Sequence, residues 1–262
     1  MNRKKIISML VFGVLIVFLI VLWFMKKQSS EELIISGHPQ WAPIMYQQDD
    51  KIIGAGPEIA SKIFEELGIK VASSYEGSWD IVQKKAREGN VDFLVAAYKT
   101  EEREKYMEYS IPYTIDPVVL VMRKGNAFSY KEWDDLITKK GVVTNGDSYG
   151  EGFDGFIKKS LKVKNVDTPK EAFDLLESEQ VDYFVYALYS TKDYIFQNNV
   201  ADTFEIAPDY ISAENFYFTF SKKSSFLKLL PKFNTILKKY QEEGIIDKII
   251  EKNKQLLWGE SS

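Results

Sequence analysis

Arg103 is the residue of this 262-residue chain best suited by type and position to bind a charged ligand. A guanidinium is always charged, and its planar fork can donate two hydrogen bonds to one carboxylate. Arg103 follows an apolar run at 91–97 and a turn that begins at Thr100. Open α/β folds bind ligands at the carboxyl edge of the sheet, so this position favours a carboxylate-binding role. The alternative is a surface arginine that balances the neighbouring glutamates.

A second group of polar residues lies at 145–148, Asn-Gly-Asp-Ser, just before a helix predicted at 150–159. Ser148 and Glu151 have the spacing of a capping box. The free N–H groups and the dipole at a helix N-terminus attract anions. Asp147 and Ser148 are therefore candidates for ligand contact, although capping alone would explain Ser148.

The composition excludes several classes of function. The chain has no cysteine, and its single histidine, His38, excludes a multi-histidine zinc site. We therefore expect no metal and no other cofactor. Five of the 34 basic residues fall in residues 1–27, which contain no acid. The remainder holds 29 basic and 38 acidic residues, a formal charge of −9, which disfavours nucleic acid as a partner.

Residues 6–25 form an uncharged run rich in Val, Ile, Leu and Phe. As a helix this run would be about 30 Å long, which matches the hydrocarbon core of a membrane. Arg3, Lys4 and Lys5 precede it and predict a cytoplasmic N-terminus, with the rest of the chain outside. A cleaved signal peptide is the alternative, but the run lacks a small-x-small cleavage site. We predict that residues 1–27 are a membrane anchor or signal and that the protein is extracytoplasmic (periplasmic).

The rest of the chain alternates short apolar runs with helical patterns, which predicts α/β layering. The predicted strands cover 33–36, 70–73, 91–97, 118–122, 141–143, 164–166, 181–185 and 216–220. The predicted helices cover 57–67, 79–88, 150–159, 169–177 and 188–197, followed by a C-terminal helical region broken at Gly244. Thr168 and Glu171 form a second capping box, with Pro169 at the first helical position.

Three stretches of the chain, taken in order, carry a resemblance to a known family. The first is Ile-Ser-Gly-His-Pro-Gln-Trp-Ala-Pro at 35–43 with Ile-Gly-Ala-Gly-Pro-Glu-Ile-Ala at 53–60. The second is Gly-Asn-Val-Asp-Phe at 89–93, Ala-Tyr-Lys-Thr-Glu-Glu-Arg at 97–103 and Tyr-Ser-Ile-Pro-Tyr at 109–113. The third is Gly-Val-Val-Thr-Asn-Gly-Asp-Ser at 141–148, followed by 172–182. Over about 33–258 the chain resembles the polar amino-acid type of bacterial periplasmic solute-binding protein, extracellular solute-binding family 3.

The resemblance implies the architecture. The fold would be α/β, of the two-lobed periplasmic-binding-protein type II, with two crossover strands between the lobes and an N-terminal transmembrane helix before them. The chain would cross near 118–122 and 210–216. Lobe one would be residues 31–118 plus 216–262, and lobe two residues 119–215.

The resemblance also implies a ligand site and its residues. Arg103 would bind the ligand carboxylate, and the 145–148 loop would close over it from lobe two. Tyr98 falls where the family commonly has a small hydroxyl residue, and His38 where it often has an acid. The candidate ligand-binding set is Arg103, Thr100, Tyr98, Ser148, Asp147, Trp41, His38 and Tyr186, with Tyr113 as a further candidate for an aromatic wall. The structural alternatives are capping for Thr100, core packing for the aromatic residues and a structural or solvent-facing role for His38.

The segment Tyr186-Ala187-Leu188 departs from the family pattern. The family uses an acid in this segment to bind the α-ammonium group of its ligand, and that position here is Ala187. A buried ammonium without a carboxylate costs several kcal/mol. We therefore expect a carboxylate-bearing ligand that is an amino acid or a related organic acid, with an organic or aromatic acid favoured.

Two other functions compete with simple ligand capture. The first is a dehydratase-like enzyme of the same fold. Asp147, Glu58 and His38 are available as acids or bases, but no two of them have a spacing that indicates a catalytic pair. No nucleophile elbow is present in the sequence. We therefore expect no catalysis and assign no catalytic residue. The second is a sensor that signals through a partner. An uptake role would need an ABC-type permease as the partner, and we expect the protein to act as a monomer.

Overall fold

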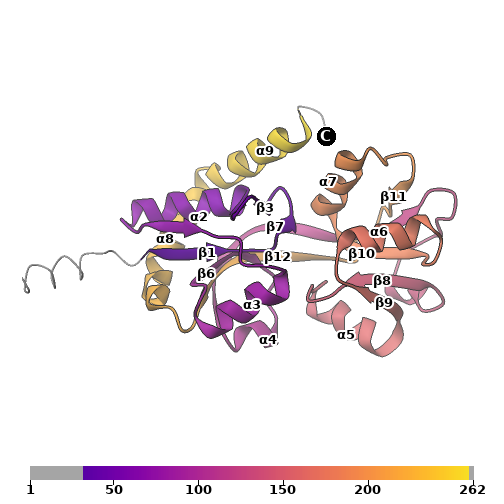
Figure 1. Ribbon diagram of the computed structural model, residues 1–262, viewed down its shortest axis with the longest axis horizontal. Helices are drawn as coiled ribbons and strands as arrows, with labels where there is room; N and C mark the ends of the chain where they lie inside the picture. Colours follow the sequence, from indigo (N-terminus) through magenta and orange to yellow (C-terminus); the bar gives the residue numbers. More distant parts are fainter. Residues whose placement is uncertain (1–31, 260–262) are drawn as a thin grey trace, which may run out of the picture. The chain divides into compact units, whose positions relative to one another are not determined.

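The structure is a computed structural model that describes residues 32–259 (Figure 1). Its elements belong to one compact unit, Leu33–Ser262. Within residues 32–259 no helix is long and apolar enough to span a bilayer. The predicted membrane segment at 6–25 lies outside the described residues.

The described chain is built on one mixed sheet of nine strands. In spatial order the strands are β5 (Val71–Ser73), β1 (Leu33–Ser36), β6 (Phe93–Ala97), β12 (Ser212–Ser221), β7 (Met107–Arg123), β10 (Tyr183–Ala187), β8 (Lys140–Thr144) and β9 (Lys162–Val166), with β11 (Phe204–Ile206) paired to β7. At one end β1 runs parallel to β5 and β6, and at the other β8 runs parallel to β9 and β10. This confirms the predicted α/β class.

Two long antiparallel strands, β7 and β12, join the two ends of the sheet. Their pairing runs from Ser212 opposite Val118 to Ser221 opposite Met107. β6 pairs with β12, whereas β10 pairs with β7. We call the elements before β7 and after β12 the first half, and the elements between these two strands the second half. β7 is far longer than the strand predicted at 118–122, and the lobe limits inferred from sequence stay a prediction.

The helices of the first half are α2 (Ala55–Glu66), α3 (Trp79–Glu88), α4 (Glu101–Glu104), η2 (Ser225–Leu229), α8 (Leu230–Glu242) and α9 (Ile245–Trp258). Helix α2 covers one face of β1 and β6, and α3 and α4 lie on the other (Figure 1). The alternation of β6 explains both contacts, because Phe93 and Val95 join the cluster around α2 while Leu94 joins Trp79 and Val82 of α3.

The second half carries η1 (Trp133–Leu136), α5 (Glu151–Ser160), α6 (Pro169–Glu177) and α7 (Leu188–Asn198). Thr168 caps α6 by accepting a hydrogen bond from the Glu171 N–H at 3.3 Å, which is one half of the predicted capping box. The Glu171 carboxylate accepts from the Asp167 N–H instead of the Thr168 N–H. The capping box predicted for Ser148 and Glu151 is wrong. Helix α5 begins after Gly150, whose φ of 93° suits glycine, and Ser148 instead donates to the Asp154 carboxylate.

A small antiparallel sheet of the first half comprises β2 (Gln40–Trp41), β3 (Met45–Gln48) and β4 (Lys51–Ile53). It was not predicted from the sequence. In the hairpin of β2 and β3, Gln40 is opposite Tyr46 and Trp41 is opposite Met45. Because neighbouring residues of a strand point to opposite faces, the hairpin presents two different sets of side chains.

Candidate ligand-binding site

Arg103 belongs to helix α4 of the first half and is buried, with 6% of its surface exposed. The β6–α4 turn holds it, because the Thr100 hydroxyl caps α4 by accepting from the Arg103 N–H at 3.2 Å. Arg103 Nε donates to Gln83 Oε1 at 2.9 Å, and Nη1 donates to the Tyr98 carbonyl at 3.1 Å. Neither bond uses Nη2. The guanidinium also lies 5.3 Å from the centre of the Trp79 ring, a cation–π distance.

Asp147, from the second half, lines the same cavity as Arg103, which we call the arginine cavity. Its Oδ2 accepts a hydrogen bond from the Thr144 hydroxyl at 2.6 Å. Its Oδ1 lies 3.3 Å from His38 Nε2 and takes part in no hydrogen bond of normal geometry, although the side chain is only 1% exposed. A buried carboxylate oxygen in this state is a strong acceptor for a cationic group.

His38 forms this contact with a defined tautomer. Its Nδ1 accepts a hydrogen bond from the Gln40 N–H at 3.0 Å, which assigns the proton of a neutral imidazole to Nε2, facing Asp147. The contact joins the first half to the second. The histidine is therefore buried at the junction of the halves, not facing solvent.

The cavity is lined by His38, Trp41, Met45, Trp79, Ala96, Ala97, Tyr98, Arg103, Asp147, Ser148 and Phe216. Its volume is only about 10 Å³, roughly the space of one water molecule. Trp41 and Tyr98 form its aromatic wall with Phe216, on which Tyr98 stacks at 4.7 Å. Opposite charges, Arg103 and Asp147, thus line one small, largely aromatic space.

The structure brings together six of the eight predicted site residues in this cavity: Arg103, Tyr98, Trp41, His38, Asp147 and Ser148. Thr100 is outside this lining and caps α4, but it lines another hollow, of about 480 Å³, together with Arg103, Asp147 and Ser148. Tyr186 lines a different cavity, and its hydroxyl donates to the Gln40 carbonyl at 3.1 Å. Tyr113 packs on Phe218 at 4.0 Å and donates to the Val95 carbonyl, which is a core role.

Asp116 is an important residue that the sequence reasoning missed. Its carboxyl is fully buried on β7, where Oδ2 accepts from Trp41 Nε1 at 2.9 Å and Oδ1 accepts from the Tyr189 N–H at 3.2 Å. The Asp116 carbonyl also accepts from the Tyr98 hydroxyl. Burial raises the pKa of the Asp116 carboxyl to about 7, opposed by these hydrogen bonds. The signal in the sequence was an acid directly before the apolar run at 117–122.

Gln83 and Trp79 were missed as partners of Arg103. They are four residues apart on α3, so they lie on the same face of that helix. Gln83 Oε1 accepts from both Arg103 Nε and the Tyr106 hydroxyl. Nothing near Trp79 or Gln83 in the chain indicated a contact with the arginine.

A mixed α/β sheet whose halves are joined by two long strands, with a charged cavity where they meet, is the arrangement of bacterial solute-binding proteins. The chain belongs to the bacterial extracellular solute-binding proteins, family 3, whose family model matches residues 33–255. This confirms the resemblance seen in the sequence and makes the protein a solute-binding protein.

The chain is similar in sequence to a named binding protein and in fold to solved structures. The L-cystine-binding protein TcyJ of Escherichia coli K12 is 24% identical over 229 residues, covering 87% of this chain and 84% of TcyJ. The structure of the amino acid ABC transporter substrate-binding protein AbpA from Streptococcus pneumoniae, bound to L-arginine, has a TM-score of 0.74 at 24% identity, covering 89% of this chain and 98% of that one. A histidine kinase sensor domain similar to periplasmic binding proteins has a TM-score of 0.72 at 22% identity, with coverages of 85% and 95%.

Proposed function

We propose that the protein captures a small carboxylate-bearing ligand, an amino acid or a related organic acid, between two lobes. The lobes are residues 31–118 with 216–262, and residues 119–215. The observation that carries the proposal is the buried Arg103 in a cavity to which both halves contribute side chains. In this proposal Arg103 grips the ligand carboxylate, Trp41 and Tyr98 form the wall, and Ser148 approaches from lobe two.

Asp147 supplies the negative charge that Ala187 does not. Its Oδ1 is buried without a normal hydrogen bond and lines the same cavity as Arg103. An ammonium on the ligand would therefore find a carboxylate there and avoid the cost of burial without a partner. This favours a zwitterionic amino acid over the simple organic acid expected from the sequence. The L-cystine of TcyJ and the L-arginine of AbpA support the same class.

Ligand entry requires the lobes to separate. A cavity of about 10 Å³ holds roughly one water molecule, so no amino acid can enter it in the described arrangement. We infer that an open state admits the ligand and that the ligand stabilises a closed state by contacting both lobes. The contact between His38 and Asp147 would break on opening.

The cellular setting follows from the family and the sequence. We propose an extracytoplasmic protein, held by residues 6–25 as an anchor or released after signal cleavage, that acts as a monomer. Its partner would be an ABC-type permease for uptake, or a sensor partner. Ligand capture takes precedence over a dehydratase activity because the family is one of solute-binding proteins.

Isothermal titration of the purified full-length chain tests the proposal. The ligands are cystine, arginine, histidine and glutamine, with acetate and benzoate as carboxylates that lack an ammonium group. We expect one of these to bind, and we expect Arg103→Ala to weaken that binding about 100-fold or more because a charge-assisted, bidentate contact is lost. Arg87→Ala is the matched control, since Arg87 is exposed on α3 and pairs with Glu102. Equal affinity of Arg103→Ala and the parent chain would refute the assignment.

A further inference from the structure

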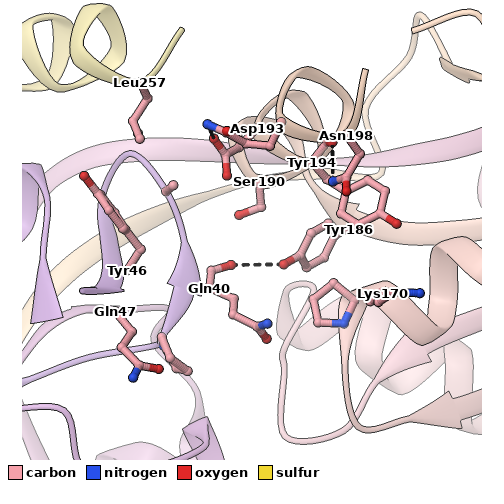
Figure 2. A pocket seen from close by; sticks show the side chains of 14 residues that line it. Gln40, Tyr46, Gln47, Lys170, Tyr186, Ser190, Asp193, Tyr194, Asn198 and Leu257 are labelled. Atoms are coloured by element: carbon pink, nitrogen blue, oxygen red, sulfur yellow. Dashed lines mark hydrogen bonds between the residues drawn. The ribbon is translucent and has the colours of Figure 1, made fainter. Parts of the chain in front are cut away.

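A second cavity, of about 380 Å³, lies between the β2–β3 hairpin and helix α7 (Figure 2). The first half contributes Gln40, Tyr46 and Gln47, and α7 contributes Ser190, Asp193 and Tyr194. None of its lining residues also lines the arginine cavity. Its volume lies within the range of small-molecule sites, whereas the arginine cavity lies far below that range.

The β2–β3 hairpin separates the two cavities. Trp41 and Met45 line the arginine cavity, while Gln40 and Tyr46, their neighbours in the chain, line the second. Because side chains alternate along a strand, the two pairs lie on opposite faces of the hairpin. The hydrogen bond from the Tyr186 hydroxyl to the Gln40 carbonyl, at 3.1 Å, joins two residues that line the second cavity (Figure 2). The second cavity is therefore a separate space and not an extension of the first.

Asp193 gives the second cavity a negative charge. Its Oδ1 accepts from Trp258 Nε1 at 3.0 Å and from Gln197 Nε2 at 3.4 Å, and both of these donors are neutral. The cationic lining residue, Lys170, lies 2.7 Å from Asp174 in an ion pair, so its charge is already balanced. Burial raises the pKa of the Tyr46 hydroxyl, and the charge of Asp193 raises it further.

Ser190 is a second polar residue of this lining. It is buried, with 5% of its surface exposed, and its hydroxyl makes no hydrogen bond of normal geometry. Burial raises the pKa of Tyr186 well above its usual value, and an interaction with the Ser190 hydroxyl opposes this shift. Figure 2 shows the Ser190 hydroxyl and the Asp193 carboxylate on the same side of the cavity, both turned toward the hairpin.

We propose that this second cavity binds a small organic cation, with an ammonium or guanidinium group on Asp193 and Ser190. A hydrogen bond to the charged Asp193 would supply most of the affinity, and the rings of Tyr46 and Tyr194 would cover the apolar part of the ligand. This site is separate from the arginine cavity, and the proposal does not depend on which ligand that cavity takes.

A ligand in the second cavity should also tighten ligand binding in the arginine cavity. This step rests on the proposed function. Residues of both halves line the second cavity, so a ligand there contacts its full set of partners only when the halves are closed. It therefore favours the same state as the ligand on Arg103, and each ligand tightens the binding of the other by the same factor.

The test uses the full-length chain with putrescine and agmatine, amines that lack a carboxylate. Isothermal titration and thermal unfolding are measured for the parent chain, Asp193→Asn, Ser190→Ala, Arg103→Ala and the matched control Asp202→Asn, which neutralises an exposed acid of the second half. We expect one of these amines to bind the parent chain and to raise its Tm. Asp193→Asn should weaken that binding about tenfold or more, Ser190→Ala should weaken it less, and Asp202→Asn should leave it unchanged.

The outcomes separate the two sites. Amine binding that survives Arg103→Ala and is lost in Asp193→Asn supports the second site, even if Arg103 proves to bind nothing. Failure of both amines to bind the parent chain overturns the proposal. So does equal affinity of the parent chain and Asp193→Asn, or amine binding that is lost in Arg103→Ala, which would place the amine in the arginine cavity.

Discussion

Asp116 is buried where three parts of the chain meet, since it belongs to β7 and binds Trp41 of β2 and the backbone of α7. Its pKa of about 7 results first from burial, which disfavours the charged form. In the unfolded chain the same carboxyl titrates near 3.8. Between these values the folded protein binds a proton on Asp116 that the unfolded chain does not bind.

Burial of Asp116 should make the folded protein less stable at neutral pH than at acidic pH. Because the folded state binds more protons between about pH 4 and pH 7, its stability falls as pH rises through this window and is level above it. Asp116 alone should contribute a loss of about 2 to 3 kcal/mol between pH 5 and pH 8. Urea unfolding of the parent chain and of Asp116→Asn at both pH values measures this. The difference between the two pH values should shrink in the variant, and an unchanged difference would contradict the assignment.

We propose that Asp147 selects the ligand class, because its charge would pair with an ammonium group of the ligand. Asp147→Asn keeps the shape and one acceptor oxygen but removes the charge. We expect it to weaken a zwitterionic ligand by about tenfold or more and to leave a carboxylate without an ammonium group nearly unaffected. Titration of both ligand types measures the contrast. Asp167→Asn is the control, because Asp167 is an exposed acid that bonds to Asn145 near the same loop. Equal losses for the two ligand types would show that Asp147 has only a structural role.

The sequence predicted the residues that line the arginine cavity better than it predicted the residues that contact them. Arg103 was identified because ligand binding is one of the few roles that suit a guanidinium directly after a buried strand and a capped turn. Gln83 and Trp79 were missed because they are 20 and 24 residues from Arg103, and Asp116 because it is 75 residues from Trp41, so these pairs meet only through folding. Tyr186 lines the second cavity and not the arginine cavity, and its position at the end of β10 does not reveal that its hydroxyl bonds to Gln40.

At the scale of elements, the parallel strands β8 and β10 depend on one glycine. Gly141 pairs directly with Tyr183, and a Cβ at this position would overlap the Tyr183 ring. Gly141→Ala should therefore destabilise the protein by about 1 to 3 kcal/mol, the usual effect of overpacking. Urea unfolding measures the loss.

Two further variants isolate this contact. Combining Gly141→Ala with Tyr183→Leu should cost less than the sum of the two single changes, because the smaller side chain makes room. Gly155→Ala is the matched control: no atom lies within 4 Å of the added Cβ on helix α5, so the change should be neutral or stabilise by up to about 1 kcal/mol. Strict additivity in the double variant would rule out the overlap as the cause.

Elements with a strong pattern were predicted well and short ones were not. α3 and α6 match their predicted ranges, since apolar residues at helical spacing lie between a capping residue and a stop. The strands β2, β3 and β4 contain two to four residues each, too few to show alternation. Most of β7 was missed because Pro112, Asp116 and Pro117 interrupt its apolar pattern, although a strand that pairs with β12 tolerates them.

At the scale of the whole described chain, function depends on the relation between the two halves. Covalently they are joined through β7 and β12, and polar contacts between them include His38 with Asp147, Tyr186 with Gln40 and Trp258 with Asp193. Each of these polar contacts is worth about 1 kcal/mol net. Such contacts can be exchanged for ligand contacts at modest cost, which suits a protein that opens and closes.

Ligand-driven closure is the prediction that tests this relation. Small-angle scattering of the full-length chain with saturating ligand should give a smaller radius of gyration than without it, because the ligand contacts both lobes and favours the closed state. The matched control is Arg103→Ala under the same conditions, in which the radius should stay at its ligand-free value. An unchanged radius in the parent chain, at a ligand concentration that titration shows to be saturating, would mean that binding does not close the lobes.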